Sequence, residues 1–308
     1  MAEMEQAAIG MLLGSRDSSG ALVGRDGRVL ARVSVPNAET PAEGVDGLVA
    51  MARSLARRAQ RQGVTVAAAG IGFPGVVDPA NGVVRGTRVA MRAWRGTPLR
   101  SDLEERIGLP VRVTNDAVSI LIGEAAAGCV VGQRSVVLAY SSAGVGGAIM
   151  LDGEVRLGRR GAVGHLGHVP SSAAIGIPCS CGGTGHLDPV ASASGMTAWY
   201  REQRHLSAGD APYLRVVAEA AAQGDAVAQE ALVRGGAALG VALGGVANLL
   251  DPDVVVLAGE SAENGTYREA ALSAMRAELI PGGATPEVLT WALGGDAQVI
   301  GAALGALG

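Results

Sequence analysis

Short apolar runs alternate with segments of helical periodicity along the first part of the chain. Residues 6–13 and 64–75 are apolar runs of strand length, and the second run enters a Gly-Pro turn. Residues 20–35 form two strand-like runs around Arg-Asp-Gly, which is typical of a hairpin. The elements predicted after these are helices over 41–62, 99–108 and 116–128, and a strand over 110–114.

A similar order of elements recurs in the second part of the chain. Residues 134–155 indicate a hairpin of buried strands, and residues 251–261 indicate a strand that ends in a glycine turn. Helical spacing is found over 190–204, 211–223, 225–250, 266–279 and the last residues of the chain. Two rounds of hairpin, helix, strand and helix predict an α/β protein built from two similar lobes.

Composition narrows the function classes. The chain has 308 residues, of which 48% are hydrophobic and only 3% aromatic, so the core is expected to be aliphatic. A net charge of −4 with scattered basic residues argues against a nucleic-acid surface. The pattern predicts no membrane span and no signal peptide, so a cytoplasmic protein with reduced thiols is expected. Three cysteines fit no disulfide framework.

Most of the histidines and cysteines lie in one glycine-rich segment. His168, Cys179, Cys181 and His186 have the spacing H-x10-C-x-C-x4-H. Four nitrogen and sulfur ligands suit tetrahedral zinc and leave no open position, so this pattern predicts a structural metal that holds the loop. The alternative is four unrelated side chains in a loop. His165 is a further candidate ligand, or it lines a neighbouring site.

The sequence around these ligands resembles the zinc signature of the ROK family (repressors, open reading frames and sugar kinases). The similarity extends over nearly the whole chain and includes residues 70–84, 94–117 and 238–260. It implies an actin-like, ribonuclease-H-like sugar kinase fold with two lobes, a central cleft and usually a dimeric assembly. We expect residues 1–117 plus about 295–308 to form the N-terminal lobe, and residues 118–294 to form the C-terminal lobe with the zinc loop.

Family members are hexose and N-acetylhexosamine kinases or sugar-responsive repressors. The repressors carry an added N-terminal helix-turn-helix region, and we expect none here because the first predicted strand begins at about residue 6. The family's Asn-Asp pair matches Asn115 and Asp116. By this resemblance, Asp116 accepts the proton of the sugar hydroxyl and Asn115 binds a ring hydroxyl. The alternative is that the pair only caps a helix, which is common for these residue types.

The family's first phosphate loop, D-x-G-G-T-K, is poorly matched by residues 12–19. Gly14 is retained, but Leu12 stands in place of the aspartate and Asp17 in place of the lysine. Leucine cannot help to organise magnesium, and Asp17 adds negative charge where a triphosphate would lie. Arg16 would partly offset that charge, and an ordinary polar turn is the alternative interpretation.

The second phosphate loop is better matched. Gly144, Gly146 and Gly147 correspond to family glycines, and Gly259 to the glycine turn on the nucleotide side. Glycines let backbone N–H groups approach phosphate oxygens.

On the sugar side, His165 stands where the family has a sugar-binding glutamate, and Asp188 keeps a carboxylate on a shorter arm. His186 replaces a thiolate ligand, and the segment before Trp94 lacks the asparagine that is usual in sugar-binding relatives.

These residues leave three functions open. The first is phosphoryl transfer from ATP and Mg²⁺ to a hydroxyl of a hexose or amino sugar, with Asp116 as base and activity that the altered first loop could impair. The second is a pseudokinase that binds a small sugar-like ligand without catalysis. The third is a repurposed, ATP-independent enzyme that uses Asp116 and His165 as acid and base. For each of them we expect a homodimer with no nucleic-acid or membrane partner.

Overall fold

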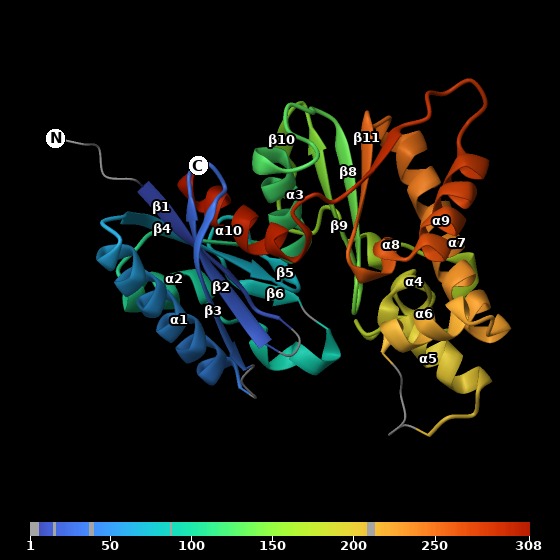
Figure 1. Cartoon of the computed structure of the whole chain (residues 1–308), viewed down its shortest axis with the longest axis horizontal. Helices are drawn as coiled ribbons and strands as arrows, with labels where there is room; N and C mark the ends of the chain where they lie inside the picture. The colour runs from blue at the N-terminus through green and yellow to red at the C-terminus, as the bar shows by residue number, and fades with distance from the viewer. Residues whose placement is uncertain (1–5, 15–16, 37–39, 87, 208–212) are drawn as a thin grey trace. The chain divides into compact units, whose positions relative to one another are not determined.

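The computed structural model describes residues 6–14, 17–36, 40–86, 88–207 and 213–308 (Figure 1). The chain divides into two compact units. Unit 1 comprises Met1–Gln133, Ile149–Gly164 and Trp291–Gly308, and unit 2 comprises Arg134–Ala148 and His165–Thr290. Unit 1 thus holds the predicted N-terminal lobe and, in addition, residues 118–133, 149–164 and 291–294.

Unit 1 is built on a five-stranded sheet with the order β3-β2-β1-β4-β7. The predicted hairpin is present, since β2 pairs antiparallel with β3. Strand β1 also pairs antiparallel with β2, while β1, β4 and β7 run parallel. The strands are β1 Gln6–Leu12, β2 Asp17–Gly24, β3 Val29–Pro36, β4 Thr65–Phe73 and β7 Val111–Asn115, and β5 Val76–Val77 and β6 Val84–Gly86 form a separate ribbon. The helices are α1 Pro41–Arg61, η1 Val89–Trp94, α2 Leu99–Ile107, α3 Asp116–Ala127, η5 Gly294–Asp296 and α10 Ala297–Leu307.

Strand β1 is buried on both faces, which explains why its sequence is a continuous apolar run. Ile9 belongs to the core cluster beneath α1, whereas Ala8 belongs to the cluster beneath α10 (Figure 1). Helix α10 lies very close to the sheet, because a Cβ atom at Gly10 would be 1.8 Å from the carbonyl oxygen of Val299. The small residues of β1 therefore set the distance at which the last helix packs.

The ends of the predicted helices in unit 1 follow known capping rules. Thr40 and Glu43 form a capping box at the start of α1, with Thr40 Oγ1 accepting from Glu43 N at 3.3 Å. Helix α2 ends at Gly108, whose φ of 70° is the left-handed conformation that glycine adopts without strain.

Unit 2 is organised around the sheet β10-β9-β8-β11-β12, in which β8, β11 and β12 run parallel. Strand β9 begins in unit 2, and its last residues and β10 belong to unit 1. The strands are β8 Val136–Ser141, β9 Val145–Leu151, β10 Glu154–Val155, β11 Val254–Ala258 and β12 Glu287–Thr290. The helices are η2 Leu166–His168, η3 Ser172–Ala174, α4 Asp188–Ala191, α5 Ala193–Gln203, α6 Leu214–Ala222, α7 Ala226–Leu250, α8 Glu260–Glu263 and α9 Gly265–Glu278.

Helix α7 is the longest helix of unit 2, and by length and composition it is apolar enough to cross a membrane. Half of its most apolar window is buried, and its small residues pack against α9 (Figure 1). For example, a Cβ atom at Gly240 would be 2.2 Å from the carbonyl oxygen of Ala271. These contacts are those of a core helix.

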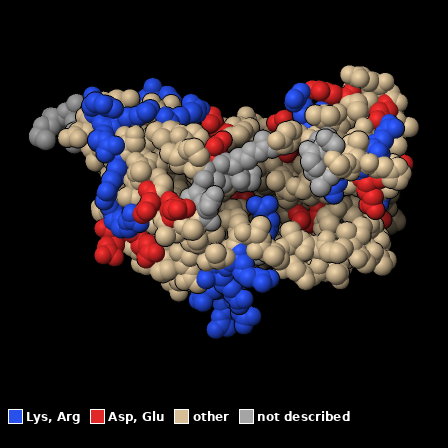
Figure 2. Space-filling model, turned by 90° about the horizontal axis from the view of Figure 1, so that it is seen from below, with Lys and Arg blue, Asp and Glu red and all other residues tan. Residues whose placement is uncertain are grey.

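Figure 2 shows separate basic and acidic groups among other residues on one face of the molecule. Several form exposed ion pairs, such as Arg106–Asp46 and Arg85–Asp78, each with a shortest N–O distance of 2.6 Å. Such exposed pairs contribute about 0–1 kcal/mol each, so the fold depends mainly on its apolar clusters.

Candidate functional site

In unit 1, the candidate catalytic residues lie at the edge of the sheet where three parallel strands end. The register pairs Leu12 of β1 with Gly72 of β4, and Phe73 of β4 with Asn115 of β7. The loops that follow these strands therefore share one edge, which is where ligands bind in open α/β sheets. Asn115 Nδ2 donates to the carbonyl oxygen of Gly75 at 3.1 Å and so ties two of these loops together.

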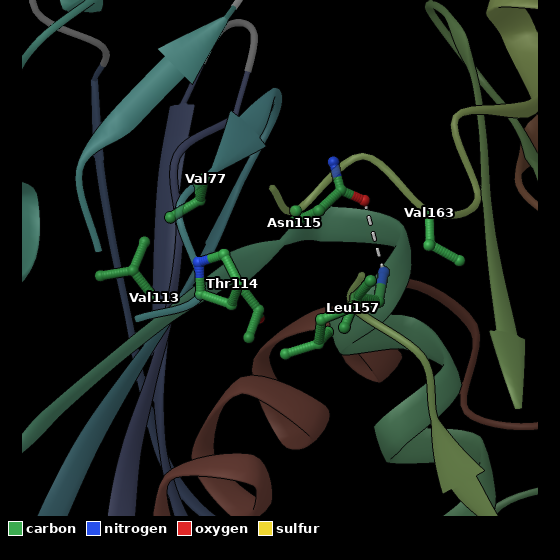
Figure 3. Close-up of a pocket in the computed structure, with 9 residues that line it drawn as sticks. Val77, Val113, Thr114, Asn115, Leu157 and Val163 are labelled. Atoms are coloured by element: carbon green, nitrogen blue, oxygen red, sulfur yellow. Dashed lines mark hydrogen bonds between the residues drawn. The ribbon is translucent and has the colours of Figure 1, made fainter. Parts of the chain in front are cut away.

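Asn115 is the N-cap of α3. Its Oδ1 accepts from Ala117 N at 2.9 Å and from Val118 N at 3.4 Å, and Figure 3 shows the second of these bonds. The capping interpretation is therefore confirmed for Asn115. The cap uses the amide oxygen, and an amide nitrogen has two N–H donors, so capping is compatible with a contact to a sugar hydroxyl. That contact stays a prediction.

Asp116 occupies the first turn of α3 and is partly exposed. Its Oδ1 accepts from Ala117 N at 2.9 Å. Although the residue is partly exposed, the surrounding protein desolvates its carboxyl group and raises the pKa of Asp116 to about 6, and this shift is opposed by the Ala117 N–H group and by the positive charge of Arg88. At neutral pH the carboxylate is thus mostly ionised and more basic than an ordinary aspartate. This combination suits a general base.

A small pocket lies beside Asn115. Its lining side chains include Val77, Val113, Leu157 and Val163 (Figure 3). It encloses about 10 Å³, which is room for about one water molecule. The pocket is therefore too small and too apolar to hold a sugar.

In unit 2, the glycine-rich turn follows β8. The Ser142 N–H group donates to the carbonyl oxygen of Gly144 at 2.9 Å, which closes the turn between β8 and β9. Gly259 follows β11, the parallel neighbour of β8, and has a φ of 94°. A Cβ atom at Gly259 would be 2.3 Å from the carbonyl oxygen of Ser141. Only glycine meets both the backbone angle and this close approach, so Gly259 packs directly behind the turn.

The other two predicted glycines, Gly146 and Gly147, lie within β9, and Gly147 is buried. Neither has a positive φ, so neither is required by backbone conformation. The phosphate contacts expected of this loop stay predictions.

Asp188, at the start of α4, is buried and already engaged within unit 2. Its Oδ1 accepts from Val145 N at 2.7 Å, and its Oδ2 accepts from Ser180 Oγ at 3.3 Å. His165 directly precedes η2, and its ring centroid is 6.2 Å from that of His168. Contacts of Asp188 and His165 with a sugar stay predictions.

The four predicted metal ligands come together in unit 2. Their ligand atoms all lie within 4.8 Å of one another. Cys179 Sγ lies 3.7 Å from His168 Nδ1, and Cys181 Sγ lies 3.3 Å from His186 Nδ1. Zinc with ordinary bond lengths and tetrahedral angles separates sulfur and nitrogen ligands by about 3.6 Å. The geometry therefore fits Zn²⁺ with no open position, and His165 lies outside the set.

Backbone pairing holds the ligand loop in shape. Pro178 and Thr184 form an antiparallel bridge, and Cys179 N donates to the carbonyl oxygen of Gly183 at 2.8 Å. Gly183 N lies 3.4 Å from Cys181 Sγ, which suits a thiolate that accepts an N–H bond. Burial lowers the pKa of His168, and this favours the neutral imidazole that binds metals.

The segment expected from the resemblance to be the first phosphate loop differs from the family motif in chemistry as well as in sequence. Leu12 is partly buried and packs against the cluster beneath α10, and Asp17 is exposed at the start of β2. Gly14 lies between them, where a Cβ atom would be 2.1 Å from the carbonyl oxygen of Asp17. Arg16 and Ser15 lie outside the described residues. The chain contains no lysine, so the family's phosphate-loop lysine cannot be replaced by a lysine from another position.

Two residues of these sites were not indicated by the sequence patterns. Arg88 acts on Asp116 through its charge, and Ser180 contacts Asp188. Arg88 lies in the segment before Trp94, which was noted only for its missing asparagine. Ser180 stands between two predicted metal ligands, and this position was the only feature of the sequence that could have indicated a role for it.

The residues and spacings of both units match one family. The family model named ROK family matches residues 8–307. The chain belongs to the ROK family. The family and the actin-like α/β fold predicted from the sequence are therefore confirmed.

Several ROK relatives are similar over nearly their full lengths. The chain is 31% identical to a glucokinase of Thermotoga maritima, over 96% of this chain and 95% of the relative. A crystal structure of a ROK family glucokinase from Streptomyces griseus, in complex with glucose and AMPPNP, has a TM-score of 0.86 at 28% identity and covers 98% of this chain and 99% of its own.

A ROK family transcriptional regulator, described as a homolog of the Escherichia coli MLC protein, has a TM-score of 0.84 at 25% identity. That match covers 97% of this chain and 77% of the regulator. The relatives thus include both kinases and a regulator, and homology supports sugar phosphorylation in general.

Proposed function

We propose that this ROK protein transfers a phosphoryl group from ATP to a hydroxyl of a hexose or amino sugar, with Asp116 as general base. The observation that carries the proposal is the position and basicity of the Asp116 carboxylate. It lies at the carboxyl edge of parallel strands, is held in the first turn of α3, and has a pKa raised to about 6. A base with this pKa is ionised at pH 7 and still takes up a proton readily as the hydroxyl attacks.

The phosphate side of the reaction is assigned to unit 2. The turn that ends at Gly144 and the Gly259 turn follow neighbouring parallel strands, so both lie at one edge of the second sheet. Backbone N–H groups at such turns suit phosphate oxygens. Bound Mg²⁺ would supply charge neutralisation on the phosphates. His168, Cys179, Cys181 and His186 would hold a Zn²⁺ that stabilises its loop without taking part in the chemistry.

The test is phosphoryl transfer with purified protein, Mg-ATP and a panel of hexoses and N-acetylhexosamines, measured as sugar-dependent ADP release. We expect the wild type to turn over at least one sugar. This activity should be lost in Asp116→Asn and kept in Asp102→Asn. Asp102 is a suitable control because it is also an aspartate in the first turn of a helix of unit 1, α2. Equal turnover of wild type and Asp116→Asn would contradict the assignment.

A second candidate, a pseudokinase that binds a sugar-like ligand, is favoured by one observation. Leu12 and Asp17 border the first loop where the family has an aspartate and a lysine. Calorimetric titration with Mg-ATP separates the two functions, in the presence and absence of each sugar. Sugar binding without ATP binding would favour the pseudokinase, and ATP binding that tightens with one sugar would favour the kinase.

We also propose that the protein is a cytoplasmic homodimer, as expected from the resemblance. Size-exclusion chromatography with light scattering gives the mass in solution. A mass equal to that of one chain, 30.8 kDa, at micromolar concentration would contradict the dimer.

A further inference from the structure

Asp188 links the glycine-rich turn, where phosphate binding is expected, to the metal loop, where structural zinc is expected. One carboxylate oxygen accepts from the backbone N–H group of Val145, where β9 leaves the glycine-rich turn, at 2.7 Å. The other oxygen accepts from Ser180 Oγ at 3.3 Å. Ser180 stands between the predicted ligands Cys179 and Cys181, so a single buried side chain joins the metal loop to the glycine turn.

The contact with the turn is direct and tightly packed. A Cβ atom at Gly144 would lie 3.0 Å from Asp188 Oδ1, so the carboxylate lies against the backbone of the turn itself. A hydrogen bond from a backbone N–H group to a buried carboxylate is stronger than one between neutral groups. The bond to Val145 therefore fixes where the turn begins to run into β9.

The part of the metal loop (residues 168–186) that carries Ser180 contributes little to the apolar core, since Ser180 and Cys181 are exposed and Cys179 alone of these three residues is buried. Both carboxylate oxygens of Asp188 accept hydrogen bonds from residues of unit 2. This arrangement differs from the sugar contact that the resemblance implies.

We propose that Asp188 is a positioning residue that couples the metal loop to the glycine-rich turn, so that the bound metal sets the turn's affinity for the phosphates of ATP. The phosphate role of the turn rests on the proposed kinase function, whereas the coupling itself does not. Loss of the metal would release Ser180, and loss of Asp188 would release Val145. Either change would loosen the turn without altering Asp116.

The first experiment measures hydrogen exchange of peptides that cover Val145 by mass spectrometry. In Asp188→Ala, exchange at Val145 is expected to become about tenfold faster or more, because the amide loses a charged acceptor. Asp188→Asn is expected to keep slow exchange, since its Oδ1 can accept from Val145 as in the wild type, and its Nδ2 can donate to Ser180 Oγ, which reverses the direction of that hydrogen bond. Asp253→Ala is the control, because Asp253 is exposed and its side chain lies outside this network.

The second experiment tests coupling to the metal with Ser180→Ala, an exposed position where the chain is expected to fold. Removal of the metal with a chelator should speed exchange at Val145 in the wild type and have a much smaller effect in Ser180→Ala and Asp188→Ala. If chelation acts equally in all three proteins, or if Asp188→Ala leaves exchange at Val145 unchanged, the coupling is refuted.

The kinetic consequence separates positioning from sugar binding. Asp188→Ala is expected to raise the KM for ATP at least about fivefold and to leave the KM for the sugar within about twofold. Asp188→Asn is expected to restore the KM for ATP. A raised KM for the sugar alone would assign Asp188 to the substrate and overturn the proposal. Absence of turnover in the wild type would refute the kinase function, while the exchange results would still decide the coupling.

Discussion

Glu124 is expected to be a large single contributor to the stability of unit 1. The residue lies on α3, and its carboxylate is completely buried, with 0% of the residue exposed. It accepts three backbone hydrogen bonds: Oε2 from Cys129 N at 2.8 Å and from Ala292 N at 3.1 Å, and Oε1 from Leu293 N at 2.9 Å. These donors belong to two segments that are far apart in the sequence and that Glu124 holds together.

Replacement by alanine would leave all three N–H groups without an acceptor. An unsatisfied buried donor costs about 1–3 kcal/mol, and water that enters the cavity recovers part of this cost. We therefore expect Glu124→Ala to lower the free energy of unfolding by about 3–5 kcal/mol, out of a total of about 5–15 kcal/mol for a typical domain. Glu124→Gln keeps one carbonyl oxygen and loses about one acceptor, so a loss of about 1–3 kcal/mol is expected.

Urea denaturation followed by circular dichroism and tryptophan fluorescence measures these changes. Trp291 directly precedes Ala292, so its fluorescence reports on the segment that Glu124 holds. Glu105→Ala serves as the control, because Glu105 is exposed on α2 and its loss should change stability by less than about 0.5 kcal/mol. A Glu124→Ala midpoint equal to that of the control would refute the reasoning.

Three further predictions concern the candidate sites. Asp116→Asn is expected to lower kcat by about 10²–10⁴ and to leave ATP affinity unchanged, as measured by ADP release and calorimetry; a smaller loss would remove Asp116 as the base. In the wild type, kcat/KM should fall about tenfold per pH unit below about pH 6 and level off above it, because only the deprotonated Asp116 accepts a proton; a flat profile from pH 5 to 8 would contradict this. In thermal unfolding, Gly259→Ala should lower the melting temperature by more than Gly282→Ala does. Both glycines have a positive φ (94° and 86°), but of the two only Gly259 has a backbone atom within 4 Å of the added Cβ. Equal decreases in melting temperature would show that the close approach is unimportant.

The sequence predicted most of the elements because each depends on local pattern. The hairpin around residues 25–27, the helix that ends at Gly108 and the long helix over 225–250 were all expected from turn residues, caps and periodicity. The edge strand β12 was not predicted, because its four residues, Glu287–Thr290, are partly exposed and show no continuous apolar run.

The candidate sites were predicted unevenly for a related reason. The four metal ligands lie within nineteen residues of one another and keep a recognisable spacing, so their grouping could be expected from the sequence. The raised pKa of Asp116 could not be expected from the sequence, because it depends on desolvation in the folded chain and on the charge of Arg88. The hydrogen bonds of Glu124 with Ala292 and Leu293 could not be predicted either, since they join segments that are far apart in the sequence.

The packing of α10 has a consequence for how the protein is made. This helix is the last element of the chain, yet it fills one side of the first sheet and touches β1, β4 and α3. Gly10 and Gly70 provide the space for it, since added Cβ atoms would lie 1.8 Å from the carbonyl oxygens of Val299 and Ala302. During synthesis the ribosome delivers β1 first and α10 last. The core of unit 1 can therefore close only after α10 has left the ribosome, and until then one face of its nascent sheet stays available to chaperones.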